Sequence, residues 1–516
     1  MNVINTTILT YFHRLLKDLE KTSINPALSQ EKTLKYLIEG GKDTFFGKEH
    51  HFDSINNYDD FRKFIPIRSY EELKPYIERL RKGENYILWN QKVKWFAKSS
   101  GTSSKSKYIP ITPDNLTKCH YHGFKQMLTY YLQQYPNSKI LYGKALTLGG
   151  SIQIDELSPN NIFKPDIFHG DLTAILLKNS PYYAELARVP SRKIAILTDF
   201  EKKVELIAKN YSKSNITNFS GVPSWNLIML RKILEYNNAK TISEIWPNIE
   251  LFMHGGINFE PYKTQFDEII GNSQMHYLEN YNASEGYFAY QNDPTDPGLQ
   301  ISLNNGIFYE FIPLNYLHEV SQNTSNEIVP LSQVKKDINY AMVISTNSGL
   351  WRYLIGDCVK FISTYPYKLV ITGRTQLYIN AFGEELMIGN AEQALSKACN
   401  ITGYSIVDYT VAPIYMKNNN RGRHQWFIEF ENNHKNQNID IEKFAEILDE
   451  VLCNINSDYE AKRKETKTMS CLSIISGKPG VFYKWMETSN KIGGQNKVPR
   501  LSNDRNLIEA LLLLNK

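Results

Sequence analysis

The sequence has few cysteines, and their spacing suits neither metal nor disulfide chemistry. The five cysteines among 516 residues are far apart and odd in number, with no Cys-x-x-Cys pair. Such spacing argues against a zinc ribbon and against a secreted disulfide framework. Reduced thiols are the simplest account, so we expect a cytoplasmic protein.

Long apolar runs and an excess of one charge are also missing. No stretch of the sequence approaches the roughly 20 apolar residues that span a bilayer, and 59 basic residues nearly balance 54 acidic ones. The first residues lack the pattern of a signal peptide, because Ile4, Ile8, Phe12, Leu15 and Leu19 recur at helical spacing. We therefore expect neither membrane nor nucleic-acid binding. The oligomeric state stays open.

One segment is rich in hydroxyl groups and lysines. Residues 98–107 are Lys-Ser-Ser-Gly-Thr-Ser-Ser-Lys-Ser-Lys, and they follow the apolar run Val93–Ala97. Hydroxyls and backbone N–H groups in such a loop can cradle oxyanions, while lysines supply countercharge for a triphosphate. The segment is not a Walker loop, because no Gly-Lys-Ser/Thr follows a first glycine at the required spacing. A solvated turn is the alternative.

Helical and strand-like patterns alternate along the chain. Helical spacing covers Tyr70–Arg81 and Leu116–Gln134. The short β-rich apolar runs are Ala145–Leu148, Ile194–Leu197, Ile249–Phe252 and Ala341–Ile344. Several runs lead into glycine-containing turns, which is typical of loops gathered at one edge of a sheet. The alternation predicts an α/β fold with a ligand bound along that edge.

The pattern changes near residue 380, where a smaller α+β domain is predicted. Its expected elements are helix Ala391–Ala398, strand Ser405–Ala412, the polar loop Lys417–Arg423, strand Gln425–Phe430 and helix Ile441–Asn454. The length of the chain suits two or more domains of about 150 residues. We place the boundary between 1–378 and 379–516.

Three further clusters carry groups suited to a nucleotide. In the first, Tyr281 can stack a purine, Ser284 can hold a phosphate and Glu285 can ligate Mg²⁺. In the second, Asp357 follows a glycine and can accept both ribose hydroxyls. In the third, Arg374 can hold ribose or phosphate. Their structural alternatives are a strand end, a capping aspartate and a surface arginine.

In this order the clusters resemble the auxin-responsive Gretchen Hagen family of acyl-acid amido synthetases. That family lies within the adenylate-forming superfamily of acyl-CoA synthetases, peptide-synthetase adenylation domains and luciferases. Ser99–Ser103 resembles its phosphate loop, Tyr281–Glu285 its second nucleotide motif and Tyr353–Asp357 its third. His254–Tyr262 resembles the turn beside the adenine, and Gly494–Arg500 resembles the C-terminal signature. The resemblance covers nearly the whole chain.

The resemblance implies a luciferase-like fold and a two-step reaction. A large N-terminal adenylate-forming domain of stacked sheets and helices would carry a smaller, mobile α+β domain. A carboxylic acid would attack the α-phosphorus of ATP and release pyrophosphate. An amine, such as an amino acid, would then attack the acyl-adenylate to form an amide. ATP and Mg²⁺ would be required, and the partners would be the small-molecule acid and amine.

The resemblance also implies roles for individual residues. Glu285 would ligate Mg²⁺, and Lys497 would swing in from the small domain to neutralise the phosphates. The residues implied to bind ATP are Ser99, Ser100, Gly101, Thr102, Ser103, Gly256, Tyr281, Ser284, Tyr353, Asp357 and Arg374.

The chain departs from the family pattern at two places. Its phosphate loop is about one residue short, with Ser104 and Lys105 where a glycine often falls. Leu354 stands where the plant members usually carry a second arginine. The plant members are also longer, which suggests a bacterial relative here. Conjugation of plant hormones therefore does not follow.

Two other functions remain open at this point. An acyl-CoA ligase uses the same adenylate, and a non-catalytic nucleotide- or acyl-binding interaction protein could keep the fold without turnover. Retention of Glu285, Asp357 and Lys497 argues against the second. His120 and His122 are two residues apart on an expected helix, which is the wrong spacing for one helical face, so metal binding there is disfavoured.

Overall fold

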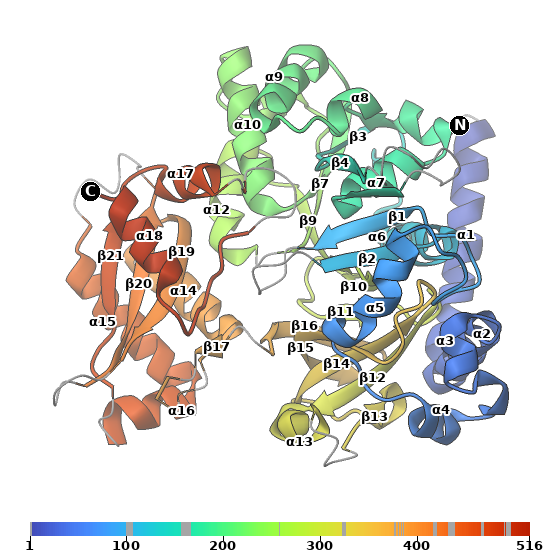
Figure 1. Cartoon of the computed structure of the whole chain (residues 1–516). Helices are drawn as coiled ribbons and strands as arrows, with labels where there is room; N and C mark the ends of the chain where they lie inside the picture. Colours follow the sequence, from blue (N-terminus) through green and yellow to red (C-terminus); the bar gives the residue numbers. More distant parts are fainter. Residues whose placement is uncertain are drawn as a thin grey trace.

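The computed structural model consists of a larger N-terminal part and a smaller C-terminal part. It describes residues 3–99, 107–155, 167–256, 259–321, 327–375, 378–379, 381–382, 384, 386–415, 421–431, 439–465, 469–489, 491 and 497–516. In Figure 1 the larger part runs from blue to yellow, and the smaller part, in orange and red, lies beside it.

A twelve-stranded sheet forms the centre of the larger part. Its strands in spatial order are β13 (Val329–Pro330), β12 (Ile307–Pro313), β14 (Asn339–Thr346), β15 (Tyr353–Thr364), β16 (Tyr367–Arg374), β11 (Leu299–Ile301), β10 (Gly286–Gln291), β9 (His276–Ala283), β8 (Leu251–His254), β7 (Ile216–Gly221), β3 (Lys144–Thr147) and β6 (Arg188–Val189). Strand β9 is the seam of the sheet, because it pairs parallel with β8 and antiparallel with β10. The strands from β8 to β6 are parallel, so their carboxyl ends meet at one edge.

A second sheet of four strands carries the start of the hydroxyl-rich segment. Its order is β2 (Lys107–Ile111), β1 (Trp95–Ser99), β5 (Ile167–Gly170) and β4 (Ile152–Asp155). Strand β1 is antiparallel to β2 and parallel to β5. The chain therefore leaves β1 and β5 at the same edge of this sheet.

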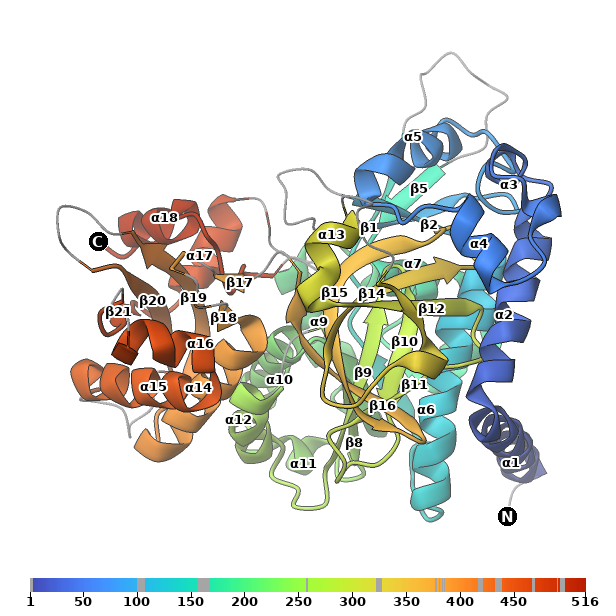
Figure 2. The ribbon, with the colours of Figure 1, turned by 90° about the horizontal axis from the view of Figure 1, so that it is seen from below.

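Helices surround both sheets, as Figures 1 and 2 show. They are α1 (Val3–Ile24), α2 (Pro26–Gly41), α3 (Phe45–Glu49), α4 (Tyr58–Phe64), α5 (Tyr70–Arg81), α6 (Tyr121–Gln134), α7 (Leu172–Asn179), α8 (Arg192–Ala195), α9 (Phe200–Tyr211), α10 (Pro223–Asn237), α11 (Ile242–Ile245), α12 (Glu260–Ile270) and α13 (Leu317–Ser321). In α5 the apolar residues Tyr70, Leu73, Ile77 and Leu80 recur at helical spacing and are buried. Within the part of the chain that the structure describes, no helix is long and apolar enough to cross a membrane.

The smaller part has its own sheet, helices and core. Its elements are β17 (Tyr378–Ile379), β18 (Leu386–Met387), α14 (Ile388–Thr402), β19 (Ile406–Ile414), β20 (Arg423–Phe430), α15 (Ile441–Ile455), α16 (Ser457–Glu460), β21 (Ser473–Gly477), α17 (Val481–Thr488) and α18 (Asn506–Leu514). Leu395 of α14, Trp426 of β20 and Leu448 of α15 are fully buried together in this core. Figure 2 shows α14 and α15 on one side of the small sheet.

The predicted α/β fold with a large N-terminal and a smaller C-terminal domain is confirmed. The helix predicted at Tyr70–Arg81 has the same bounds in the structure, and the strand predicted at Ala341–Ile344 lies within β14. The loop predicted at Lys417–Arg423 falls largely outside the described residues.

One predicted strand is wrong, because Ile194–Leu197 belongs to the turn of helix α8 and its end. The N–H groups of Ile194 and Ala195 both donate to the carbonyl oxygen of Ser191, at 3.0 and 2.9 Å. The preceding strand β6 ends at Val189, and the next residue, Pro190, has no N–H to continue a ladder. Local hydrogen bonds thus determine the conformation of this short run, although its residues are mostly apolar.

Candidate active site

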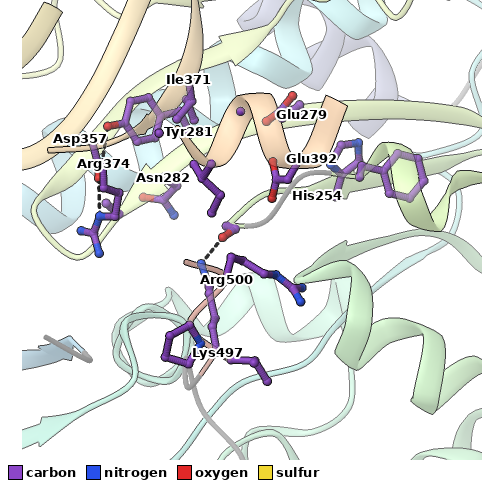
Figure 3. Close-up of a pocket in the computed structure, with 18 of the residues that line it drawn as sticks. His254, Glu279, Tyr281, Asn282, Asp357, Ile371, Arg374, Glu392, Lys497 and Arg500 are labelled. Atoms are coloured by element: carbon purple, nitrogen blue, oxygen red, sulfur yellow. Dashed lines mark hydrogen bonds and ion pairs between the residues drawn. The ribbon is translucent and has the colours of Figure 1, made fainter. Parts of the chain in front are cut away.

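A cavity of about 2460 Å³ lies between the two parts of the molecule. Its walls include the carboxyl ends of β8 and β9, the paired strands β15 and β16, helix α14 and the segment from Lys497 to Leu507. Figure 3 shows side chains from the large sheet facing Lys497 and Arg500 across this space. The cavity therefore gathers residues that are more than 200 positions apart in the sequence, such as Tyr281 and Lys497.

Three of the predicted site residues form one hydrogen-bonded group. Tyr281 of β9 donates its hydroxyl hydrogen to Oδ2 of Asp357 at 2.5 Å. The Nε of Arg374 donates to Oδ1 of the same carboxylate at 2.8 Å. Asp357 of β15 and Arg374 of β16 are direct partners in the strand register, so the sheet itself sets this contact (Figure 3). The charge of Asp357 raises the pKa of Arg374, which stays protonated.

A second group lies next to the first and centres on Glu285. Glu285 is 8% exposed and lines the cavity together with Ser284. Burial raises the pKa of Glu285, as does the charge of Asp357, while Lys107 acts in the opposite direction. Burial also lowers the pKa of Lys107, whose Nζ donates to the hydroxyl oxygen of Tyr353 at 3.3 Å.

Tyr353 and Lys107 refine what the sequence indicated. Tyr353 is fully buried, is absent from the residues that line the cavity, and contacts Lys107 of the second group through its hydroxyl oxygen. Lys107 is the last lysine of the hydroxyl-rich segment, and the sequence pattern predicts no separate role for it. Its position at the end of that segment, where strand β2 begins, was the available signal.

The predicted phosphate loop lies almost wholly outside the described residues. Ser99 ends strand β1, and only its backbone is described. Ser100, Gly101, Thr102 and Ser103 are not described, so their contacts stay a prediction.

Lys497 crosses from the smaller part to the larger one. Its Nζ donates to the carbonyl oxygen of Gly256, which follows the carboxyl end of β8 (Figure 3). Gly256 has φ +83°, a backbone conformation that favours glycine. A Cβ built there would lie 3.0 Å from Nζ of Lys497, so the close approach of this lysine favours glycine as well. Lys497 is reached by the solvent of the cavity, yet the surrounding protein buries it enough to lower its pKa to about 8, and the charge of Arg374 adds to this effect.

Other contacts hold the two parts in this arrangement. Gln265 of α12 donates to the carbonyl oxygen of Ile406 at 3.1 Å. Arg500 donates to the hydroxyl of Tyr262 at 3.2 Å. The lysine and its partner glycine are therefore brought together by an extended interface.

Two further residues of the cavity wall have strongly shifted pKa values. Burial and the nearby carboxylates of Glu392 and Glu260 raise the pKa of Glu279 to about 7. Burial lowers the pKa of His254 to about 3, so this ring is neutral at physiological pH. His254 stacks on Phe259 with a centroid distance of 4.2 Å.

The residues present suit a divalent cation that is also bound by phosphates. Among the described residues there is no group of three His, Cys, Asp or Glu side chains able to hold a metal ion. The buried carboxylate of Glu285 lines the cavity on the same side as the carboxylate of Asp357. Mg²⁺ is typically bound through one or two carboxylates together with substrate phosphates, and this arrangement fits that mode.

The fold is that of the acyl-adenylate-forming enzymes. The acyl acid amido synthetase AtGH3.15 in complex with 2,4-DB superposes with a TM-score of 0.81 at 17% identity, over 98% of this chain and 96% of that one. The 2-hydroxyisobutyryl-CoA ligase in its postadenylation state gives a TM-score of 0.59 at 12% identity, over 96% of this chain and 92% of that one. The chain thus has the fold of this class of ligases.

Matches to three family domains identify the family within this fold class. The GH3 family N-terminal domain matches residues 15–275, the central domain residues 300–374 and the C-terminal domain residues 389–506. These matches cover most of the chain, and the protein belongs to the GH3 family.

Named plant enzymes match along nearly the whole length. The jasmonoyl-L-amino acid synthetase GH3.5 of Oryza sativa subsp. japonica is 24% identical over 562 residues, covering 95% of each chain. The indole-3-acetic acid-amido synthetase GH3.3 of Arabidopsis thaliana is 23% identical over 567 residues, covering 96% of this chain and 93% of that enzyme. The predicted family is confirmed.

Proposed function

We propose that the cavity carries out both halves of an amide synthesis. In the first half, a carboxylate oxygen attacks the α-phosphorus of ATP, the bond to the β-phosphate breaks, and pyrophosphate leaves. In the second half, an amine nitrogen attacks the acyl carbon, the acyl–phosphate bond breaks, and AMP and one proton leave. The group formed by Tyr281, Asp357 and Arg374, with Glu285 beside it and Lys497 opposite, carries this proposal.

The electrostatics of the cavity suit the first half-reaction. A carboxylate and a triphosphate repel one another, so their approach needs fixed positive charge in a site with little bulk water. Lys497 enters the cavity from the smaller part, the charge of Lys107 acts on Glu285 of the cavity wall, and Arg374 lies close enough to lower the pKa of Lys497. We assign Lys497 to the α-phosphate and the attacking carboxylate.

The nucleotide itself is assigned to the face formed by β9 and β15. The Asp357 carboxylate, held at both oxygens, accepts the ribose hydroxyls beside Tyr281, while Arg374 supports it. Ser284 and Gly256 border the α-phosphate and the base. Ser99, Ser100, Gly101, Thr102 and Ser103 form the loop around the β- and γ-phosphates.

Glu285 is assigned to Mg²⁺. When bound, this ion screens the phosphate charges and orients them for in-line attack. Without it, burial and the charge of Asp357 raise the pKa of Glu285, and the charges of Lys107 and Arg374 oppose this effect.

The two parts of the chain act as domains with a boundary at 378/379. Residues 1–378 hold ATP and the acid, and residues 379–516 move as a unit, because the two half-reactions need different groups around the same carbonyl. Since ATP is a substrate and all five cysteines are free thiols, we place the enzyme in the cytoplasm. Its partners are then the small-molecule acid and an amino acid.

The test is ATP–pyrophosphate exchange with a panel of aryl and fatty acids, run before any amine or CoA is added. Acid-dependent exchange is expected, since this assay reports adenylation alone. Absence of exchange with every acid, despite ATP binding, would overturn the proposal in favour of a binding protein. Amino acids and CoA are then offered to the adenylate, and thioester formation without amide would indicate an acyl-CoA ligase instead.

A further inference from the structure

Two buried residues of opposite charge line the cavity and have no part in the site described so far. Asp171 precedes α7 and is 8% exposed; Lys203 lies on α9 and is 3% exposed. Both side chains border the cavity, next to Ser151 and Gln153.

The strand register places this pair beside the predicted phosphate loop. In the parallel pairing of β1 with β5, Ala97 is opposite Gly170, so Lys98 of β1 and Asp171, the residue that follows β5, come next in the same register. Lys98 also lines the cavity, and the phosphate loop begins one residue later at Ser99. The pair is therefore near the position where the acyl–phosphate bond would form.

The backbone holds the two charges apart. Oδ1 of Asp171 accepts the N–H groups of Gly150 and Ala174, each at 3.1 Å. The Nζ of Lys203 donates to the carbonyl oxygen of Gly149. Although both side chains belong to the described residues, they form no direct ion pair with one another.

Such an arrangement is costly without a ligand. Burial lowers the pKa of Lys203 to about 8, which the charge of Asp171 only partly opposes. Burial raises the pKa of Asp171 despite its backbone hydrogen bonds. Two buried charges that do not touch lose their hydration without gaining the full Coulombic attraction of a close ion pair. A small ligand with both charges would supply each with a partner.

We propose that Asp171 and Lys203 form the subsite for the acceptor, which is a free α-amino acid bound as a zwitterion. The α-ammonium group faces Asp171, and the α-carboxylate faces Lys203, with Lys98 adding positive charge beside it. This assignment rests on the proposed function, which it deepens by naming the residues that hold the amino acid. Simple amines and CoA lack the paired charges that this subsite matches.

The first experiment uses the unmodified enzyme and needs no variant. An amino acid that supports amide formation is compared with its α-carboxamide, which keeps the amine and side chain but loses the carboxylate. A hydrogen-bonding site for a charged group rejects a ligand lacking it by about 10²-fold or more in kcat/KM. Equal use of the acid and the carboxamide would overturn the proposal.

The second experiment separates Lys203 from a structural role. In Lys203→Met, the preference for the free amino acid is expected to fall to within about threefold of unity, mainly through KM. ATP–pyrophosphate exchange is expected to stay within about twofold of the unmodified enzyme. The exposed Lys209→Met on the same helix is the matched control and should leave both quantities unchanged.

The outcomes distinguish this proposal from the proposed function. An unchanged preference in a variant that still performs exchange would overturn the subsite. If Lys203→Met loses exchange as well, the comparison is made with Lys203→Arg. Restored exchange together with a preference for the free amino acid over its carboxamide supports the subsite. Restored exchange without this preference overturns it. Failure of exchange in the unmodified enzyme would instead overturn the adenylation reaction itself.

Discussion

Two pairs of opposite charges line the same cavity, and they differ in whether the charges touch. Arg374 donates directly to Asp357 at 2.8 Å, and the strand register fixes their distance. Asp171 and Lys203 are each held by backbone groups and stay apart. The first, closed pair holds a carboxylate in place for a ligand that needs its remaining lone pairs. The second, open pair leaves both charges available to a ligand that is itself dipolar.

A third pair of opposite charges is also in direct contact, and it is almost completely buried. Arg352 binds both oxygens of Glu310, at 2.8 and 2.9 Å, and its Nη1 donates to the carbonyl oxygen of Ile65 at 2.7 Å. The two side chains are 5% and 1% exposed. No ligand can reach them, so this pair contributes to the fold alone.

The largest effect is expected from breaking the pair that is wholly buried. Arg352→Met leaves Glu310 without its charged partner inside the protein, which should cost about 3–5 kcal/mol in the free energy of unfolding. Urea unfolding measures it. The exposed Lys464→Met, which breaks an i,i+4 pair with Glu460, is the control and should leave the unfolding midpoint unchanged. Equal losses in the two variants would contradict the contrast between buried and exposed pairs.

Among the residues of the cavity, Glu285 should affect adenylation most strongly. Glu285→Ala removes the group assigned to Mg²⁺ and should lower ATP–pyrophosphate exchange about 10³-fold, with little change in stability. Glu268→Ala on the exposed face of α12 is the matched control. Exchange at the normal rate in the Glu285 variant would remove this residue from the site.

The closed pair of the cavity should affect ATP and not the acceptor. Asp357→Asn keeps the size of the side chain but loses its charge, so the hydrogen bonds to ribose weaken. KM for ATP should rise about 10- to 100-fold, as for the loss of a charged hydrogen bond. KM for the amino acid should stay unchanged, in contrast to Lys203→Met. A variant that changes both constants equally would mean that the two pairs do not serve separate substrates.

A smaller effect should appear in the pH dependence of adenylation. The pKa of Lys497 is lowered to about 8 by burial and by Arg374, so its positive form predominates only below that pH. The exchange rate should therefore fall as pH rises through about 8, by up to about tenfold per pH unit. Lys497→Arg keeps its charge and should move the fall to higher pH. Lys497→Ala should slow exchange at all pH values while ATP still binds, and an unchanged profile in both variants would exclude this lysine.

The fold and several of the residues that meet at the cavity could be predicted because their signals are local. The apolar spacing of Tyr70–Arg81 and the run Ala341–Ile344 is set by helix and strand periods of a few residues. Tyr281, Glu285 and Asp357 stand in short motifs whose residues can be seen together in the sequence. The strand predicted at Ile194–Leu197 was wrong, because an apolar stretch of four residues does not reveal which carbonyl oxygen will accept from its N–H groups.

The open pair could not be predicted, because it depends on pairing between distant segments. Asp171 looks like a helix cap, which it also is, and Lys203 looks like one lysine of a surface helix. Only the register of β1 with β5 and the contact of Lys203 with Gly149 place them in the cavity. Glu279 was missed for the same reason, since its neighbours Glu260 and Glu392 come from other elements.

The position of β9 between a parallel and an antiparallel half also has a consequence for the order of folding. The antiparallel half includes hairpins between neighbouring strands, β14 with β15 and β15 with β16, whereas the parallel half joins distant segments, such as Ala145 with Asn218. Loop closure makes such distant pairing slow. We expect pulsed hydrogen exchange during refolding to protect β14–β16 before β3 and β7, and simultaneous protection would refute this order. Because the cavity needs both halves, a chain that has folded only in part would not yet consume ATP.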